Sequence, residues 1–395
     1  MFSDHFFWLL DANLQSICNE ICWSMIFLLF LFTGFKNGFG IFLSKRRYNF
    51  GYIILFTVIM AIYSAIQSYF LHGQSLIQGL LPQRFMVGSF LLYFLIMHYL
   101  NKDYDYINTL KSVFLSVGYV EMILYIAQYL IIDHMVFLRM PISSRFGEVR
   151  MNLGAIGIPF VVFDAINHCL NDRKINYKYI FSLLFGFYYI IVIAKTRLAL
   201  VAYTIAVLGG FLLWNNKGKK KYICIFVMLI ILLLLTKTEL FSFLIQGLNN
   251  VDLSSQTRAL GREFYIKRIS EHPLFGCGYI NMNNLNAMAY AGVNSISTGI
   301  IAWVDLGIYG LAFFFGLIGI VWFVALFYKL LVKSYKIARK GDLTFFMFIL
   351  FILVISPNST GFLWYINNTV ELVIWICLIE GTYNNIILET AKENN

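Results

Sequence analysis

Apolar runs of about 20 residues recur along the whole chain and are separated by short polar segments. Each run can cross a bilayer as an α-helix, because a helix rises about 1.5 Å per residue and the hydrocarbon core is about 30 Å thick. The pattern predicts about eleven transmembrane helices. We expect them at Ile17–Phe35, Tyr52–Leu71, Phe85–Leu100, Val113–Ile132, Asn152–Leu170, Tyr179–Ala194, Leu198–Trp214, Tyr222–Thr236, Gly307–Leu330, Thr344–Ile355 and Phe362–Ile379.

Composition supports a membrane protein and excludes an ordinary soluble one. Of the 395 residues, 60% are hydrophobic and only 13% are charged, with a mean hydropathy of +0.74. Soluble domains carry about a quarter charged residues. Asp4, Asp11 and Glu20 surround the first apolar run, which therefore differs from a cleaved signal peptide with its basic leader. We expect an all-α fold, a single transmembrane domain over 1–395 and no nucleic-acid partner.

The distribution of basic residues predicts the orientation. Alternating eleven spans from the acidic N-terminus places nineteen of the 30 basic residues on one side, which the positive-inside rule assigns to the cytoplasm. The N-terminus is then expected outside and the C-terminus inside. The cytoplasmic set comprises Lys36, Lys45, Arg46, Arg47, Lys102, Lys111, Arg173, Lys174, Lys178, Lys217, Lys219, Lys220, Lys221, Lys329, Lys333, Lys336, Arg339, Lys340 and Lys392.

The basic residues expected outside differ in kind from those inside. Eight of these eleven are arginine, whereas fifteen of the nineteen inside are lysine. Topology requires only positive charge, but phosphate and carboxylate favour the planar donor fork of a guanidinium. The bias indicates an anionic ligand outside, with contact to lipid headgroups as the simpler alternative. The outer set comprises Arg84, Arg139, Arg145, Arg150, Lys195, Arg197, Lys237, Arg258, Arg262, Lys267 and Arg268.

One long external loop, 237–295, is inserted between the predicted eighth and ninth helices. Leu240–Leu248 is apolar enough to lie in the membrane interface as a short helix. The segment QTRALGREFYIKRISEHPLFGCGY follows, and its first part predicts a second helix. Arg258 and Arg262 are four residues apart, so they share one face of that helix and can bind one anion together. A solvated helix of mixed charge is the alternative.

The end of this second helix is also visible in the sequence. Glu263 and Lys267 have the spacing of a self-neutralising pair. Pro273 is expected to stop the helix, and Gly276 and Gly278 allow a tight return of the chain.

Arg197 begins an apolar span in the segment IVIAKTRLALVAYTIAV. A charge at the centre of a membrane helix costs about 2.5–3.5 kcal/mol on insertion scales, and less near an end, so such residues often mark functional sites. Snorkelling of the side chain to the interface is the alternative.

Four segments resemble those of O-antigen and capsule polymerases (Wzy) and O-antigen ligases. KTRLAL resembles the family's small-residue-plus-Arg helix start, and GREFYIKRISEHPLFGCGY resembles its loop signature. WVDLGIYGLAFFFGLIG is similar to the return into the next span, and RFGEVRMNLGA is similar to an earlier outer loop. The resemblance covers about Arg145 to Ile320 and the motifs occur in the family's order.

The resemblance implies transfer of a glycan from polyprenyl diphosphate to a sugar hydroxyl at the outer face, without nucleotide, cofactor or metal. Arg197 and Arg262 match the motif arginines around the diphosphate. Fixed guanidinium groups can stabilise the charge of that leaving group. The remaining arginines of the two loops are expected to bind substrate: Arg145, Arg150, Arg258 and Arg268.

The general base is the point where this chain departs from the family. Ligases carry a His-Asn pair before the return span, and here Gly292-Val293-Asn294 occupies that place. Glu263, His272 and Glu271 are the candidate bases, with Glu263 and His272 placed beside the two arginines in the catalytic set. Three carboxylates fall within predicted spans and either line a cavity, pair with arginines or are simply buried: Glu121, Asp164 and Glu371.

The resemblance implies a polysaccharide polymerase of a bacterial inner membrane, with lipid-linked glycan, membrane lipids and a chain-length regulator as expected partners. A ligase of the same fold and a lipid-linked glycan flippase are the alternatives. Flippases are expected to show paired halves, and no internal repeat is visible. Asp103-Tyr104-Asp105 matches a D-x-D metal motif of nucleotide-sugar transferases, but the cysteines and histidines show no metal-binding spacing.

Overall fold

The chain is a helical, polytopic membrane protein. Seven of its described helices are long and apolar enough to cross a membrane, and two shorter apolar helices accompany them, Leu198–Leu213 and Thr344–Ile355. The fold is taken from a computed structural model. It describes residues 9–44, 48–103, 105–139, 142–145, 148–151, 157–172, 176–214, 253–281, 283–291, 303–364 and 366–393.

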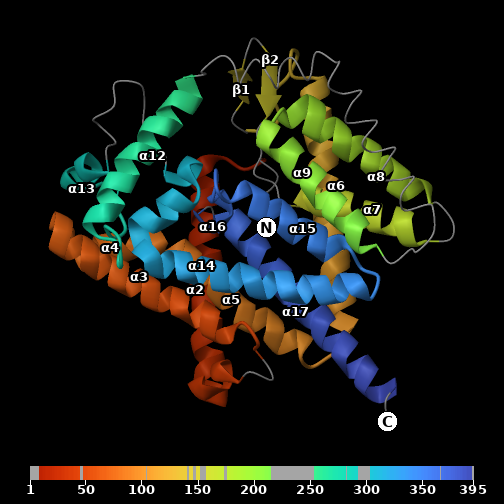
Figure 1. The fold of residues 1–395 in the computed structure, drawn as a ribbon, viewed down its shortest axis with the longest axis horizontal. Coiled ribbons are helices and arrows are strands. Elements are labelled where there is room, and N and C mark those ends of the chain that lie inside the picture. The colour runs from red at the N-terminus through yellow and green to blue at the C-terminus, as the bar shows by residue number, and fades with distance from the viewer. Residues whose placement is uncertain are drawn as a thin grey trace.

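Figure 1 shows the order of the described elements along the chain. The first part of the chain contains α2 (Ala12–Asn37), η1 (Phe39–Leu43), α3 (Gly51–His72), α4 (Leu76–Leu80), η2 (Leu81–Gln83), α5 (Arg84–Leu100) and α6 (Asp105–Leu130). The middle contains β1 (Ile142–Arg145), β2 (Glu148–Met151), α7 (Gly157–Asn171), α8 (Tyr177–Tyr188), the π-helix η3 (Tyr189–Ala194) and α9 (Arg197–Leu213). The last part contains α12 (Leu253–Glu271), α13 (Leu285–Tyr290), η4 (Trp303–Leu306), α14 (Ile308–Arg339), α15 (Thr344–Ile355), α16 (Gly361–Trp364) and α17 (Ile366–Glu393).

Most of the predicted spans agree with these helices. The expected helix Thr344–Ile355 is confirmed at both ends, whereas α6 begins eight residues before the expected Val113. The expected all-α class holds in the described chain apart from one short antiparallel hairpin of β1 and β2. The expected span Tyr222–Thr236 and the interfacial segment Leu240–Leu248 lie outside the described residues, so the count of eleven stays a prediction.

Aromatic side chains fill the centre of the bundle. Trp375 of α17 is fully buried and stacks on Phe348 of α15, with ring centroids 3.5 Å apart. Phe160 of α7 meets the same indole edge-on at 4.1 Å. In a bilayer helices associate mainly through close packing, because lipid tails are as apolar as the side chains. Trp375 therefore holds α7, α15 and α17 together.

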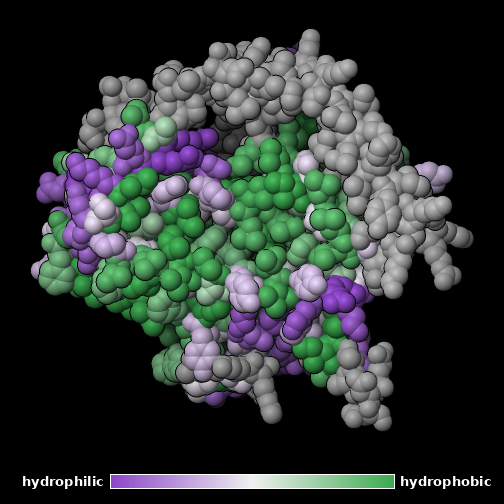
Figure 2. All heavy atoms as spheres, viewed as in Figure 1, coloured by the Kyte–Doolittle hydropathy of each residue, from purple (hydrophilic) through white to green (hydrophobic). Residues whose placement is uncertain are grey.

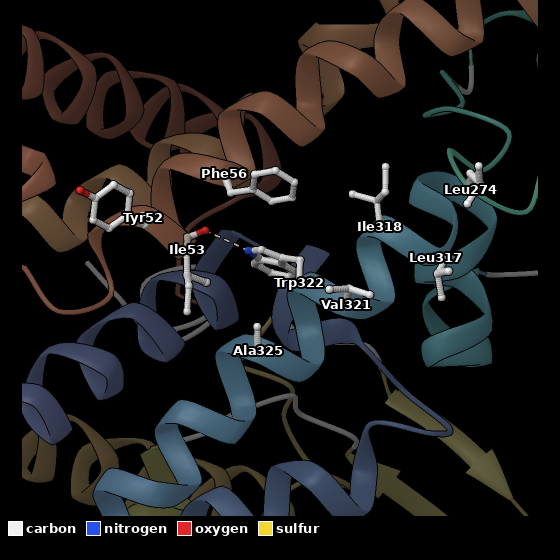
Figure 3. A pocket seen from close by; sticks show the side chains of 9 residues that line it. All are labelled: Tyr52, Ile53, Phe56, Leu274, Leu317, Ile318, Val321, Trp322 and Ala325. Atoms are coloured by element: carbon white, nitrogen blue, oxygen red, sulfur yellow. Dashed lines mark hydrogen bonds between the residues drawn. The ribbon is translucent and has the colours of Figure 1, made fainter. Parts of the chain in front are cut away.

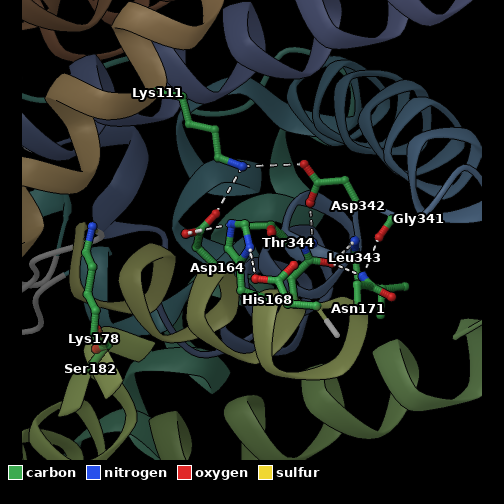
Figure 4. A network of polar contacts seen from close by, with 12 residues as sticks. Lys111, Asp164, His168, Asn171, Lys178, Ser182, Gly341, Asp342, Leu343 and Thr344 are labelled. Atoms are coloured by element: carbon green, nitrogen blue, oxygen red, sulfur yellow. Dashed lines mark hydrogen bonds and ion pairs between the residues drawn. The ribbon is translucent and has the colours of Figure 1, made fainter. Parts of the chain in front are cut away.

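One end of the bundle is rich in lysine and is joined by polar contacts across four segments (Figure 4). Lys111 of α6 forms ion pairs with Asp164 of α7 at 3.0 Å and with Asp342, before α15, at 3.5 Å. Asn171 Nδ2 donates to the Gly341 carbonyl at 2.7 Å. Asn171 Oδ1 accepts from the Trp214 indole after α9. We call this the lysine-rich end. The contacts bring together the start of α6, the end of α7, the end of α9 and the segment before α15, which the alternation of spans also places on one side.

A band of apolar surface separates the two ends of the molecule (Figure 2). The surface helices expose large apolar side chains such as Phe32, Phe70 and Val321. An apolar exterior of this kind is expected where lipid rather than water surrounds the protein. The end opposite the lysines contains α12, the β-hairpin and the turn after α15, and we call it the arginine-rich end.

Candidate functional site

The loop signature forms a turn that pairs with a break in α14. Gly316 leaves helical geometry at φ 61° and ψ −154°, which interrupts the hydrogen bonds of α14. The turn after α12 replaces them: Leu317 N donates to the Pro273 carbonyl at 2.8 Å, and Cys277 N donates to the Phe313 carbonyl at 2.7 Å. Backbone groups that are buried must find hydrogen-bond partners within the protein. The turn and the broken helix therefore form one rigid unit.

Polar side chains at the end of α3 satisfy the other side of the same turn. Gln67 Nε2 donates to the Gly276 carbonyl at 3.2 Å, and the imidazole of His72 lies 2.9 Å from the Cys277 carbonyl. Ser68 Oγ and Gln74 Nε2 both donate to the Tyr279 carbonyl, at 2.7 and 2.9 Å. Buried carbonyls left without donors cost about 1–3 kcal/mol each. These hydrogen bonds explain how the irregular turn after α12 packs stably on α3.

The helix α12 is fixed to this unit by aromatic and ionic contacts. Tyr265 is buried and stacks on Phe313 of α14 with ring centroids 4.3 Å apart. Arg268 lies 4.0 Å above the Tyr290 ring and forms an ion pair with Glu271 at 3.1 Å. Hydrogen bonds from Arg268 and from the Tyr290 hydroxyl lower the pKa of Glu271. Glu271 is thus held as a carboxylate at the end of α12.

Arg262 points from α12 to the turn that follows α15. Its Nη2 donates to Asn358 Oδ1 at 2.7 Å, while its buried Nε has no hydrogen-bond partner. An unsatisfied buried donor in a guanidinium is uncommon and indicates a place for a water or a ligand. Arg258 lies one helical turn earlier, half-buried, as the expected shared face requires. The guanidinium of Arg262 is therefore oriented by the bond from Nη2, while its Nε remains without a hydrogen-bond partner.

The start of α9, at Arg197, lies at the same end as Asn358. α9 runs antiparallel to α15: the Tyr203 and Phe351 rings are 4.7 Å apart, and Gly210 packs against Met347. Extending both helices toward the arginine-rich end brings the first residue of α9 level with the turn after α15. The side chain of Arg197 lies outside the described residues, so the approach to Arg262 is a statement about the backbone alone.

The segment before Arg197 has unusual backbone geometry. η3 is a π-helix, and Lys195 after it has φ 45°, the one positive value among the described non-glycine residues. Strained residues and π-helical turns occur often at functional sites. The Lys195 ammonium lies 5.9 Å from the Tyr129 ring centroid. Lys195, the first residue of KTRLAL, is thus a further cation at this end.

The hairpin carries the remaining candidate arginines. Its register places Arg145 opposite Glu148 and Arg150 opposite Ser143. β2 packs against η3, so the hairpin lies beside the segment that leads into Arg197 (Figure 1). The side chains of Arg145 and Arg150 lie outside the described residues. The structure thus brings the backbones of both predicted loops to the arginine-rich end.

The candidate bases occupy different surroundings. Glu263 is exposed on α12 directly after Arg262, and no ion pair joins it to Lys267; α12 instead pairs Arg268 with Glu271. His272 lies in the turn, where its carbonyl accepts from Gly276 N at 2.9 Å. Glu263 is thus an exposed carboxylate that is next to Arg262 in sequence.

Three carboxylates within the spans are buried. Asp164 pairs with Lys111 at the lysine-rich end and so does not pair with an arginine of the site. Glu121 and Glu371 are buried in α6 and α17. Asn368, one turn before Glu371, has a buried Oδ1 without a hydrogen-bond partner. This acceptor lies near the start of α17.

Sequence reasoning missed Asn358, the residue that orients Arg262. It belongs to the polar run Pro357-Asn358-Ser359-Thr360 between two apolar segments, which marks a turn and carries no separate functional signal. Among the described residues no group of three His, Cys, Asp or Glu side chains is arranged to hold a metal ion. The positions that can bind a ligand are cationic and suit an anion.

Neither protein-family models nor curated protein sequences give a match to this chain.

Proposed function

We propose that this protein is a membrane glycosyltransferase that polymerises lipid-linked glycan. It transfers a glycan from polyprenyl diphosphate to the sugar hydroxyl of another lipid-linked repeat unit. The observation that carries the proposal is the placement of Arg262: its guanidinium is held by Asn358 and keeps a buried donor open, at the end of the bundle where α9 begins with Arg197. The motif resemblance and the arginine bias support the same ligand, a diphosphate.

The proposed chemistry needs three groups. The acceptor hydroxyl attacks the anomeric carbon, the bond from that carbon to the diphosphate oxygen breaks, and the electron pair leaves with polyprenyl diphosphate. Arg262 and Arg197 stabilise the charge that develops on the leaving group. A carboxylate takes the hydroxyl proton, and Glu263 is our candidate because it is exposed beside Arg262.

The topology belongs to the same proposal. The arginine-rich end faces outside and the lysine-rich end faces the cytoplasm of a bacterial inner membrane, because basic loops are retained on the cytoplasmic side. The N-terminus is then outside and the C-terminus inside. A chain-length regulator is the expected protein partner, and a ligase or a flippase is the alternative function.

Arginine-to-lysine substitutions test the proposal. Lysine keeps the charge but loses the planar fork, so Arg197→Lys and Arg262→Lys should each reduce polymer by about tenfold or more while insertion stays normal. Arg139→Lys is the matched control, since this exposed arginine lies 3.7 Å from Asp11 and outside the proposed site. Cells should accumulate glycan one repeat unit long.

Two outcomes contradict the proposal in different ways. Normal chain length in both lysine variants would exclude diphosphate recognition by these arginines. Loss of all surface glycan, single-unit forms included, would favour the ligase or the flippase.

A further inference from the structure

An apolar groove runs along the outside of the bundle between α3 and α14 (Figure 3). Its volume is about 440 Å³, and Trp322 forms its buried floor, with the indole Nε1 bonded to the Ile53 carbonyl at 3.0 Å. Val321 and Leu317 form an exposed rim. The groove is lined by Tyr52, Ile53, Phe56, Leu274, Leu317, Ile318, Val321, Trp322 and Ala325. It spans nine residues of α14, Leu317–Ala325, about 12 Å, and so fits a stretch of a hydrocarbon chain.

Lysines continue the same face of α14 beyond the groove. Lys329 follows Ala325 by four residues and Trp322 by seven, so it shares their face of the helix. Its ammonium binds the Asn49 carbonyl and lies 4.9 Å from the Phe50 ring, just before Tyr52. The groove therefore ends at a cation at the lysine-rich end.

A second lysine at this place has no hydrogen-bond partner. Lys333 is 5% exposed, and its Nζ lies 3.9 Å above the Tyr383 ring and 5.8 Å from the Phe50 ring. Lys336, one turn further, is exposed and donates to the Tyr383 hydroxyl at 3.3 Å. Burial disfavours the charged form of a lysine, and an anion or a ligand nearby favours it.

Among the described residues of this cluster, the fixed negative charge is smaller than the positive charge. Glu380 is buried and accepts from Asn49 N at 2.7 Å and from the Tyr93 hydroxyl at 2.8 Å. It is one carboxylate beside the ammonium groups of Lys329, Lys333 and Lys336. An additional anion at the end of the groove would balance the excess.

We propose that the groove and the lysine cluster together bind an anionic phospholipid of the leaflet at the lysine-rich end. One acyl chain lies in the groove, and the headgroup phosphate contacts Lys329, with Lys333 and Lys336 adding to the local positive field. Basic pockets between membrane helices bind acidic headgroups in this way. The acyl chain gains little by leaving bulk lipid, so the lysines determine the selectivity for the headgroup.

The experiment uses the full-length protein, purified in detergent and stripped of lipid. Phosphatidylglycerol and phosphatidylcholine with identical acyl chains are added, and native mass spectrometry counts bound lipid while thermal unfolding records Tm. We expect phosphatidylglycerol to bind at least tenfold more tightly and to raise Tm further. Lys329→Gln and Lys333→Gln should each reduce this preference about fivefold, the effect of about 1 kcal/mol per lysine.

Two further variants separate the groove from general surface charge. Lys340→Gln removes an exposed lysine at the same end and should leave the preference unchanged. Ala325→Phe keeps every lysine but fills the groove, and it should abolish the bound lipid. This variant and the wild-type comparison still decide the question if the lysine variants fail to fold.

Three outcomes would overturn the proposal. One is equal binding of the two lipids to the wild type. Another is stabilisation by glycerol phosphate as large as that by phosphatidylglycerol, because the anion alone would then suffice. The third is an unchanged preference in Ala325→Phe, which would leave the groove without a role.

Discussion

Gly316 offers a sharp test of how the signature turn is held. Alanine at this position must adopt φ 61° and ψ −154°, a conformation open almost only to glycine, which costs about 1–3 kcal/mol. Its Cβ would also lie 2.4 Å from the Leu274 carbonyl oxygen and 2.5 Å from Gly276 N. Relief of that overlap requires the turn and the helix to separate, at a further cost of about 1–3 kcal/mol. We expect Gly316→Ala to lower the free energy of unfolding by about 2–6 kcal/mol.

Gly73 is the matched control for backbone strain. It ends α3 with φ 65° and ψ 17°, and a Cβ there would meet no atom within 4 Å. Gly73→Ala therefore carries only the left-handed strain of about 1–2 kcal/mol. Both variants are unfolded reversibly by SDS in mixed micelles, and the difference between them reports the contact with the turn.

Gly276 tests the same contact from the other side. Its Cβ would lie 2.5 Å from Gly316 N, so Gly276→Ala and Gly316→Ala disturb one shared contact and their effects should not add. The reasoning would be refuted if Gly316→Ala cost no more than Gly73→Ala. Strict additivity of the two turn variants would show that the turn and α14 are not a single unit.

Four further outcomes are expected. Cys277 should react slowly with maleimide at pH 8 and quickly after unfolding in SDS, because it is fully buried and burial raises its pKa to about 11; equal rates would contradict this. The pKa of Glu271 is lowered, so its stabilising contribution is present above the ordinary carboxyl pKa and is lost as pH falls through the lowered value. Glu271→Gln should remove that part of the acid dependence of Tm, and an unchanged profile would count against it. Chelation by EDTA should leave polymerisation intact. Loss of polymerisation that Mg²⁺ restores would favour a metal-dependent nucleotide-sugar transferase with the D-x-D motif. A cysteine in place of Lys340 should stay unlabelled from outside intact cells, and labelling would reverse the topology.

Regular elements were largely predictable because one pattern determines them. A run of apolar residues specifies a membrane helix whatever its neighbours are, so Thr344–Ile355 is confirmed at both ends. The limits were wrong where a helix extends beyond its apolar run. α14 continues past the expected Leu330 to Arg339, with Lys333 and Lys336 in its last turns. Charged residues there end the apolar pattern but not the helix.

The local chemistry of the signature loop was predictable, and its tertiary contacts were not. Pro273 is the second residue after the end of α12, and Gly276 and Gly278 have the positive φ values that a tight return requires. Nothing in the spacing indicates that this return would pair with a break in α14 or with the polar end of α3. Gly316 reads in sequence as one small residue in an apolar span. Its partner lies about 40 positions away, and periodicity contains no information at that range.

For the site residues too, local structure was predictable from the sequence and tertiary contacts were not. The helix that carries Arg262 follows from local sequence, but its orientation depends on Asn358, which comes from a different pair of spans. The contacts that fix α12 form a series. Side chains of α3 bond to the turn after α12, the turn bonds to the break in α14, and α14 stacks on Tyr265 of α12. Arg262 lies less than one helical turn from Tyr265, so its guanidinium is only as fixed as that chain of contacts. In the proposed function Arg262 binds a diphosphate, and preorganised donors stabilise developing charge better than mobile ones. On that proposal the turn at Gly276 and Gly278 contributes to anion binding by fixing α14 and α12, although none of its own atoms needs to touch the anion.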